Sequence, residues 1–432
     1  MITGTTSPAK RRRRVTLTFI GAGLTSVSLI ATSDVTNSWG ASTDPAPPAS
    51  AASSESTGSA ESIAASTQDT TLVTAPESER IDLAVPTFSN PTAITNPRFP
   101  IAELDQVIQL GVEAGAALRF EVTLLPDTKV IEWNGQQVET LVSQFIAYQD
   151  GRVLEVAVDF FAQADDGAVW YFGEDVANYV DGAIDNTDGT WLAGRDGPPG
   201  MIMPADPQVG DVYRPENIPG FVFEEVTVMA VDQTVEGPTG PVEGAIVVQE
   251  LLMDGLLEDK TFAPGYGEFF FAVEAEQEVV QMALAVPTDL LTGAMPGELT
   301  ILSSGVDDIS GAVAAEDWEA LSATLGTMTT AWEAYQAGDV PPLLEAQMNN
   351  ALDALAEAVG ARAAPATSQA AIEVGLATLD AELQFRPPAD VDEDRLLLWA
   401  RQLEVDEAAG DTALTAGDQV VMEAIQERIG EG

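Results

Sequence analysis

Two periodicities in the chain predict an α+β fold in separate domains: an antiparallel, strongly curved β-sheet or open barrel, followed by an α-helical bundle. From Leu118 to Leu124 the sequence LRFEVTL alternates apolar and polar residues, which indicates a half-buried strand. Beyond Ser303 large apolar residues recur every three or four positions, which indicates amphipathic helices. We therefore expect an antiparallel β domain over residues 91–303 and a four- or five-helix bundle over residues 304–432.

Turn signals divide the β domain into long strands. Pairs of Asn-Gly or Asp-Gly, whose residues tolerate the positive φ angles of tight hairpins, begin at Asn134, Asp150, Asp166 and Asp181. Their spacing of 15 or 16 residues predicts a meander of antiparallel strands from about residue 115 to 285. Strands of this length coil, so the sheet should be curved rather than flat.

Each predicted helix carries one apolar seam. From Trp318 to Tyr335 the large apolar residues are spaced three and four positions apart, and further seams follow towards the C-terminus. The connections between these seams are short, so we expect neighbouring helices to be antiparallel.

Two acids, Asp406 and Asp418, continue the last two seams at positions where apolar residues are expected. The simplest interpretation is that each seam reaches solvent near a turn at Gly410. Alternatively, the two carboxylates are buried against Arg401 or Arg395, or they are weak candidates for a metal site.

The composition excludes several classes of function. The 432 residues include 18 Lys and Arg against 69 Asp and Glu, a formal net charge of −51, and neither His nor Cys. These absences exclude Ser-His-Asp and Cys nucleophiles and the usual zinc sites, and leave carboxylate, Tyr, hydroxyl, Arg and backbone chemistry. The charge repels nucleic acid. We expect no cofactor: the acidity is most simply a solvated surface, although clustered carboxylates could bind Ca²⁺.

The N-terminus has the anatomy of a secretory signal peptide, which we place at residues 1–33. Five positive charges at residues 10–14 precede a mostly apolar run over residues 15–31. Cleavage would leave no stable membrane span, and an uncleaved anchor is the alternative. Residues 34–90 are rich in Ala, Ser, Thr and Pro and predict a disordered linker. We therefore expect an exported protein, either secreted or associated with the cell envelope.

The segment VWYFGEDVANYVDG, residues 169–182, places aromatic residues beside two acids, Glu174 and Asp175. Adjacent residues on a strand point to opposite faces, so any carboxylate partner for either acid must come from another segment. A bulge at Gly173 would re-aim nearby side chains. The simplest interpretation is an aromatic core with both acids solvated, and the functional interpretation is a ligand-binding face. Its candidate residues are Trp170, Tyr171, Glu174, Asp175 and Trp191; catalytic residues are unknown.

Residues 191–220 are rich in Pro and Gly and predict a long irregular excursion, either functional or a structured cover. Four motifs in the chain resemble those of a group of exported bacterial proteins of uncharacterised function, found largely in actinobacteria. They are WYFGEDV, WLAGRDGPPGMIMPADPQVGDVYRPE within this stretch, FAPGYGEF and RPPADVDEDRLLLWARQL. The resemblance runs from Asn96 to the C-terminus. It implies no catalytic residues, because the group has none established. Relatives usually contain some histidines, so the resemblance also implies that His has no shared catalytic role.

Three functions remain open, and each predicts a different structure. We expect first an exported, non-enzymatic binding or interaction protein, whose β domain binds an unknown apolar or amphipathic ligand or an envelope protein and whose helical bundle is an interaction module. This function predicts a deep apolar cavity lined by few charges. A hydrolase or isomerase using carboxylates and Tyr predicts two or more carboxyl groups within about 5–10 Å in a cleft. Extracytoplasmic Ca²⁺ binding predicts six or more oxygens converging on one point.

Overall fold

The computed structural model describes residues 15–17, 27–29 and 72–430. The predicted signal peptide and the first part of the predicted linker therefore lie outside the described residues, except for strands β1 (Val15–Leu17) and β2 (Val27–Leu29), which pair with each other. No helix in the described part of the chain is long and apolar enough to span a membrane.

The end of the predicted linker lies against the sheet. Phe88 packs edge-on against Phe172, and the backbone N–H of Ser89 donates a hydrogen bond to Asp165. The packed chain therefore begins before the predicted boundary at residue 90, because these contacts hold the segment to the strands.

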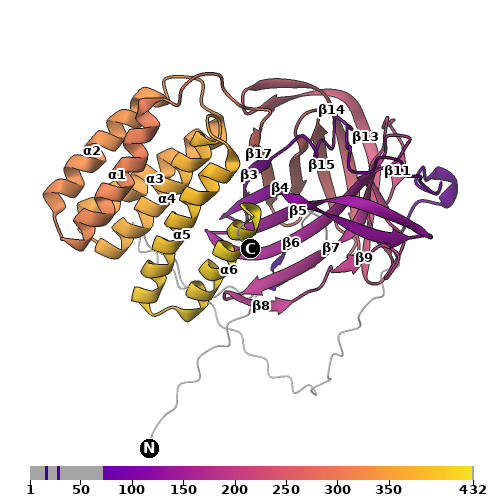
Figure 1. The fold of residues 1–432 in the computed structure, drawn as a ribbon, viewed down its shortest axis with the longest axis horizontal. Coiled ribbons are helices and arrows are strands. Elements are labelled where there is room, and N and C mark those ends of the chain that lie inside the picture. The colour runs from indigo at the N-terminus through magenta and orange to yellow at the C-terminus, as the bar shows by residue number, and fades with distance from the viewer. Residues whose placement is uncertain (1–14, 18–26, 30–71, 431–432) are drawn as a thin grey trace, which may run out of the picture.

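Fifteen strands form one antiparallel sheet that does not close on itself (Figure 1). They are β3 (Gln106–Glu113), β4 (Ala116–Trp133), β5 (Gln136–Gln149), β6 (Arg152–Gln163), β7 (Val169–Val180), β8 (Ala183–Asn186), β9 (Trp191–Leu192), β10 (Gly200–Met203), β11 (Val212–Tyr213), β12 (Asn217–Ile218), β13 (Val222–Gly237), β14 (Gly240–Leu252), β15 (Leu257–Ala263), β16 (Gly267–Val273) and β17 (Glu278–Val286). The main path is β10-β7-β6-β5-β4-β3-β17-β16-β15-β14-β13-β11, with β8 and β9 on β7 and β12 on β13. The predicted meander is confirmed, although it starts earlier than residue 115. The Pro-rich excursion is a cover built from four short strands, β9 to β12.

Three of the four predicted hairpin turns have the expected conformation. Both residues of the pairs that begin at Asn134, Asp150 and Asp181 have positive φ angles, the geometry of tight two-residue turns. The turn between β6 and β7 is different: Asp166 lacks a positive φ angle, and its carboxylate accepts a hydrogen bond from the backbone N–H of Ala168.

The sheet is strongly curved, as predicted. Phe120 on β4 and Phe271 on β16 stack with ring centroids 5.8 Å apart, although β3 and β17 lie between their strands. In a flat sheet three strand steps of about 4.8 Å would place them roughly 14 Å apart. We call the concave face that carries these two rings the inner face, and the opposite face the outer face.

Six helices follow the sheet, one more than the largest number predicted. They are α1 (Gly297–Ala314), α2 (Trp318–Tyr335), α3 (Pro342–Ala361), α4 (Ala364–Glu382), α5 (Pro388–Ala409) and α6 (Thr412–Arg428). The missed helix is α1, which starts before the predicted boundary at residue 304. Its buried residues Leu299, Leu302, Val306 and Ile309 form a seam with the same spacing of three and four.

The helix ends follow local signals. The carboxylate of Asp317 accepts a hydrogen bond from the N–H of Ala320 at the start of α2, and Asp411 accepts one from the N–H of Ala413 at the start of α6. Helices α3, α4 and α5 have Pro in their first turn, where a missing N–H costs nothing. Gly410 ends α5 with a φ of 75°.

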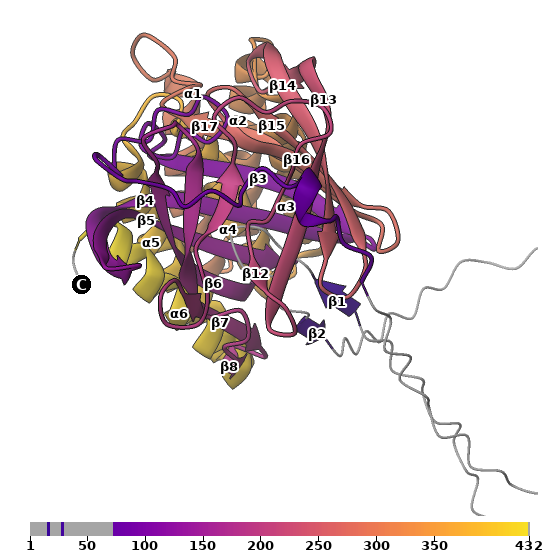
Figure 2. The same cartoon turned by 90° about the vertical axis from the view of Figure 1, so that its right-hand side faces the viewer.

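The helices cover part of the outer face of the sheet, over β4, β5, β6 and β17, whereas β11, β13 and β14 lie away from them (Figure 1 and Figure 2). Ile146 and Tyr148 of β5 pack with Trp399 of α5 and Val421 of α6. Tyr148 and Trp399 stack with ring centroids 5.9 Å apart. The helices and the sheet therefore share one apolar interface.

Because of this cover, the LRFEVTL strand within β4 is buried on both faces, and the prediction of a half-buried strand is wrong. Its polar residues Arg119 and Glu121 face the helices rather than solvent. There Arg119 pairs with Asp380 of α4, and Glu121 pairs with Arg428 of α6. Residues that were predicted to face solvent because they are polar thus form buried ion pairs instead.

Candidate functional site

Three of the five predicted ligand-binding residues meet on the inner face. Tyr171 and Glu174 lie on β7, and Trp191 of β9 packs edge-on against Tyr171 with ring centroids 5.4 Å apart. Trp170 is buried on the opposite side of the strand, and Asp175 is exposed. The two acids point to opposite faces, as predicted. The prediction that both are solvated is wrong, because Glu174 is 0 % exposed.

Gly173 explains why Tyr171 and Glu174 share a face. It has a φ of 112° and lies in a bulge, where the register with β6 shifts next to Asp159. The extra residue turns Glu174 towards the inner face. A Cβ added to Gly173 would lie 2.2 Å from the carbonyl oxygen of Trp191, so the bulge requires glycine.

Gly173→Ala should therefore lower the free energy of unfolding by about 2 kcal/mol or more, because both the φ angle and the backbone contact oppose a side chain. Urea unfolding of the full chain measures this change. Gly311→Ala is the matched control: Gly311 is exposed on α1 with no atom near an added Cβ, so this change should stabilise the chain by up to about 1 kcal/mol. Equal effects of the two changes would contradict the role of the bulge.

Three carboxyl groups gather around the bulge on the inner face. Asp159 of β6 stands directly opposite Glu174 in the strand register, and Glu216 lies near enough for its charge to act on Glu174. The hydroxyl of Tyr171 donates a hydrogen bond to Asp159 at 3.2 Å, and the indole N–H of Trp191 donates one to Glu216 at 2.7 Å. The partners of Glu174 thus come from other segments, as the sequence required.

Burial controls the protonation of these acids. Desolvation raises the pKa of Glu174 and of Asp159 well above their usual values, and neighbouring carboxylates raise both further. Burial also raises the pKa of Glu216 to about 8 and that of Glu155 to about 8. At neutral pH Glu216 and Glu155 therefore hold protons rather than negative charge.

A second group of inner-face acids surrounds Lys260 of β15. Its Nζ lies 2.8 Å from Glu250, 3.1 Å from Glu258 and 3.7 Å from Glu268. Burial alone would lower the pKa of Lys260, but the charges of Glu250 and its neighbours raise it, so the ammonium group stays charged. Glu250 and Glu258 face each other directly in the strand register. Like charges so placed destabilise a sheet, and the ammonium group between them offsets the repulsion.

A cavity of about 80 Å³ reaches the inner-face acids. Its lining is mainly apolar, with Asp159 and Glu268 as its two acids. Such a volume accommodates a few water molecules but no sugar or peptide. Two carboxyl groups thus line a cavity with room for a few water molecules.

A much larger groove of about 690 Å³ lies between the outer face of the sheet and helices α3, α4 and α5. Leu110 and Val112 of β3 and Val279 of β17 line it from the sheet, and Leu343 and Leu376 line it from the helices. The volume lies in the range of sites that bind drug-sized molecules.

The groove carries few charges, and they are of both signs. Its charged lining residues are Arg119, Asp150, Arg152 and Glu373. Both guanidinium groups are already held by buried carboxylates, Arg119 by Asp380 and Arg152 by Asp406. The lining thus has two cationic and two acidic side chains, in contrast to the large excess of acids in the chain as a whole.

Asp406 and Asp418 are 4 % and 1 % exposed, so the prediction that their seams reach solvent is wrong. Their partner is neither Arg401 nor Arg395 but Arg152 of β6, whose Nη1 lies 2.6 Å from Asp406 and 3.4 Å from Asp418. Burial and the neighbouring Asp406 raise the pKa of Asp418 to about 7. The alternative that these two carboxylates bind a metal ion stays a prediction.

The sequence analysis missed the partners of Glu174, although one signal was present. In LEVAVDF, Glu155 and Asp159 occupy the same face of the strand. Nothing in a single strand shows whether that face meets solvent or the interior of a curved sheet. No sequence pattern pointed to Glu216 as a partner, because it lies in the irregular excursion, where strand periodicity gives no information.

No protein-family model, curated protein or solved structure matches this chain. The resemblance to exported actinobacterial proteins therefore stays a prediction, and function has to be argued from the geometry of the chain's own residues.

Proposed function

We propose that this chain is an exported, non-enzymatic binding protein that holds an amphipathic small molecule in the groove between the outer face of the sheet and helices α3, α4 and α5. The single observation that carries the proposal is the groove itself, about 690 Å³ in volume, mainly apolar and lined by few charges. The signal-like N-terminus supports export.

The apolar part of such a ligand would cover side chains that now meet water. Val112 and Val279 stand opposite each other in the register of β3 and β17, and they are 49 % and 37 % exposed. Covering apolar surface contributes about 2.5 kcal/mol for every 100 Å² removed from water. The polar head of the ligand would meet the exposed side-chain amides of Gln281 and Asn350, which line the same groove.

The helices would then serve two purposes. One side of the bundle forms a wall of the groove, and its other surfaces remain available for contact with an envelope protein. Leu397 of α5 is 60 % exposed and is the kind of apolar residue that such a contact would cover.

A hydrolase or isomerase based on carboxylates and Tyr is the second candidate. The observation in its favour is the hydrogen bond from Tyr171 to Asp159 beside the cavity of about 80 Å³. That cavity holds water more readily than a substrate, which favours binding over catalysis.

Ala346→Trp should weaken ligand binding at least tenfold, because Ala346 is exposed on α3 and lines the groove, where an indole ring would take the place of the ligand. The probe is a fluorescent long-chain fatty acid, titrated into the full chain while its emission is recorded. We expect saturable binding to the unmodified protein.

Ala356→Trp is the matched control, because Ala356 is exposed on the same helix and does not line the groove. This variant should bind the probe as the unmodified protein does. Absence of saturable binding, or equal binding by both Trp variants, would overturn the groove assignment. If Asp159→Asn were the only variant to lose binding, the ligand would have to bind at the inner face instead of the groove.

A further inference from the structure

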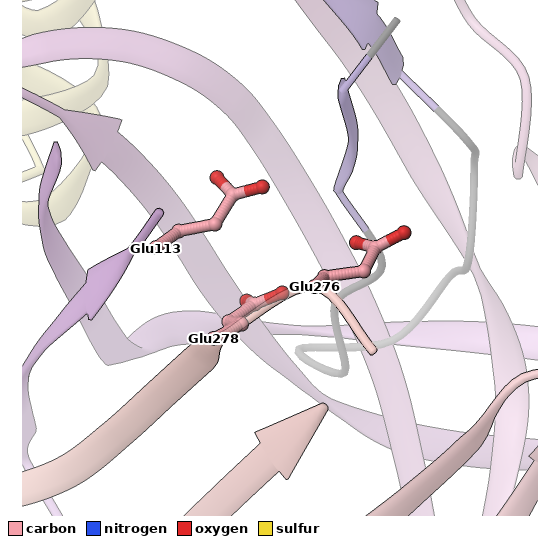
Figure 3. Close-up of side chains that lie close together, drawn as sticks. All are labelled: Glu113, Glu276 and Glu278. Atoms are coloured by element: carbon pink, nitrogen blue, oxygen red, sulfur yellow. The ribbon is translucent and has the colours of Figure 1, made fainter. Parts of the chain in front are cut away.

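A third group of carboxylates lies where β3 ends and β17 begins, on the opposite face of these strands from Val112 and Val279, which line the groove. Glu113 is the last residue of β3 and Glu278 is the first of β17, and the two stand directly opposite each other in register. Glu276 lies in the turn between β16 and β17. Figure 3 shows the three side chains gathered there, and one oxygen atom from each lies within 4.8 Å of the others.

The two strand residues are buried without adequate partners. Glu278 is 0 % exposed, and neither of its carboxylate oxygens has a hydrogen-bond partner. Glu113 is 1 % exposed. Its Oε2 accepts a hydrogen bond from the side-chain amide of Gln149 at 2.8 Å, while Oε1 has no partner. Buried acceptors of this kind need a proton or a cation.

The pKa values of the three acids also reflect the lack of partners for their carboxylate oxygens. Burial and the nearby carboxylates raise the pKa of Glu278 to about 9, and burial and Glu276 raise that of Glu113 to about 7. Burial raises the pKa of Glu276 as well.

We propose that Glu113, Glu276 and Glu278 bind one Ca²⁺ ion. Ligand oxygens lie 2.3–2.6 Å from Ca²⁺, so two of them are at most about 5 Å apart, and the 4.8 Å limit on these three meets that condition. Because Gln149 is bound to Oε2 of Glu113, the three carboxylates offer up to five free oxygens, and water would supply the remaining ligands of the six to eight that Ca²⁺ takes. The bond from Gln149 fixes Glu113 and leaves its free oxygen for the ion.

The chemistry of the cluster selects the class of ion. An all-oxygen ligand set suits hard divalent cations rather than zinc or copper, which favour nitrogen and sulfur. Mg²⁺ requires a compact octahedron and keeps most of its water, whereas Ca²⁺ accepts irregular carboxylate sets. Two more acids, Glu258 and Asp254, act on Glu278 and Glu276 and add to the negative potential.

The experiment is a thermal melt of the full chain in about 150 mM NaCl, with and without up to 10 mM CaCl₂, so that general screening of the net charge stays constant. Ca²⁺ sites of extracellular modules have dissociation constants of about 10⁻⁴–10⁻³ M. We therefore expect a saturable rise in Tm of about 2–4 °C. MgCl₂ at the same concentration should give a smaller rise, and isothermal titration should give one site.

Two variants test the assignment, and a third is their matched control. Glu276→Gln and Glu278→Gln should remove the Ca²⁺ response while leaving the chain folded, since each replaces an uncompensated acid by a neutral amide. Glu155→Gln should keep the response, because Glu155 is also buried with both oxygens unpartnered but lies on β6, outside the cluster.

Absence of a saturable Ca²⁺ response in the unmodified chain would overturn the proposal, and so would an unchanged response in both cluster variants. Loss of the response in Glu155→Gln as well would show that Ca²⁺ acts through the general charge of the inner face. The groove proposal does not depend on this site, because Ala346→Trp and the Ca²⁺ melt report on different residues.

Discussion

Replacing Asp380 by Ala should lower the free energy of unfolding by about 3–5 kcal/mol. Asp380 is 0 % exposed where α4 meets the outer face of the sheet. It accepts hydrogen bonds from Arg119 of β4 at 2.5 and 2.8 Å and from Arg395 of α5 at 2.8 Å. Burial alone would raise the pKa of Asp380, but the two guanidinium groups hold it below its usual value. Without this carboxylate both cations lose a buried partner, and the helices lose their polar tie to the sheet.

Asp307→Ala is the matched control for this change. Asp307 pairs with Arg401 at 2.5 Å, but its side chain is 67 % exposed, so its loss should cost less than about 1 kcal/mol. Urea unfolding of both variants, followed by circular dichroism, gives the comparison. Similar losses in the two variants would mean that Asp380 is not the tie between sheet and bundle.

The parts of the fold that the sequence predicts are those with local causes. The Asn-Gly and Asp-Gly pairs at Asn134, Asp150 and Asp181 turn the chain because of their own φ preferences, so the meander could be predicted. The helix seams are equally local. Helix α1 was missed although its seam from Leu299 to Ile309 has the same spacing, because Gly and Ser residues within it obscured the pattern.

The parts that could not be predicted depend on which faces meet in space. Arg119 and Glu121 alternate with apolar residues in the way that solvent-facing residues do, yet they meet Asp380 and Arg428 beneath the helices. Asp392 belongs to an acidic helix start and is nevertheless buried against Arg395. Alternation shows that two faces differ, but it does not show what covers each one.

In the candidate site, too, some features have local causes and could be predicted, whereas others depend on which segments meet in space. The bulge at Gly173 and the opposite orientation of Glu174 and Asp175 follow from strand geometry and from one glycine. The partners of Glu174 do not, because Asp159 and Glu216 reach it only when the sheet curves and the excursion folds over it. A composition with so many acids also gave no means of telling the buried acids from the solvated ones.

The stability of the chain should fall as the pH rises from 5 to 9, and Glu155 is the clearest contributor. Glu155 is 1 % exposed, both of its oxygens lack a hydrogen-bond partner, and burial raises its pKa from 4.5 to about 8. The folded chain therefore keeps a proton that the unfolded chain releases above pH 4.5. A raised pKa of this kind gives stability that is fully present below pH 4.5 and is lost as the pH rises through 8.

Glu155→Gln should remove this dependence, since the amide is neutral at every pH. At pH 5 the variant and the unmodified chain should have similar free energies of unfolding. At pH 7 the variant should be more stable by about 3–4 kcal/mol, which is two and a half pH units at about 1.4 kcal/mol each. Urea unfolding at pH 5, 7 and 8.5 measures the difference, with Asp175→Asn as a control for the change in net charge at an exposed acid. A constant offset between variant and unmodified chain across these pH values would show that Glu155 is ionised in the fold. The inner face would then hold its negative charge by some means other than protons, and a cation near the sheet would be the first to look for.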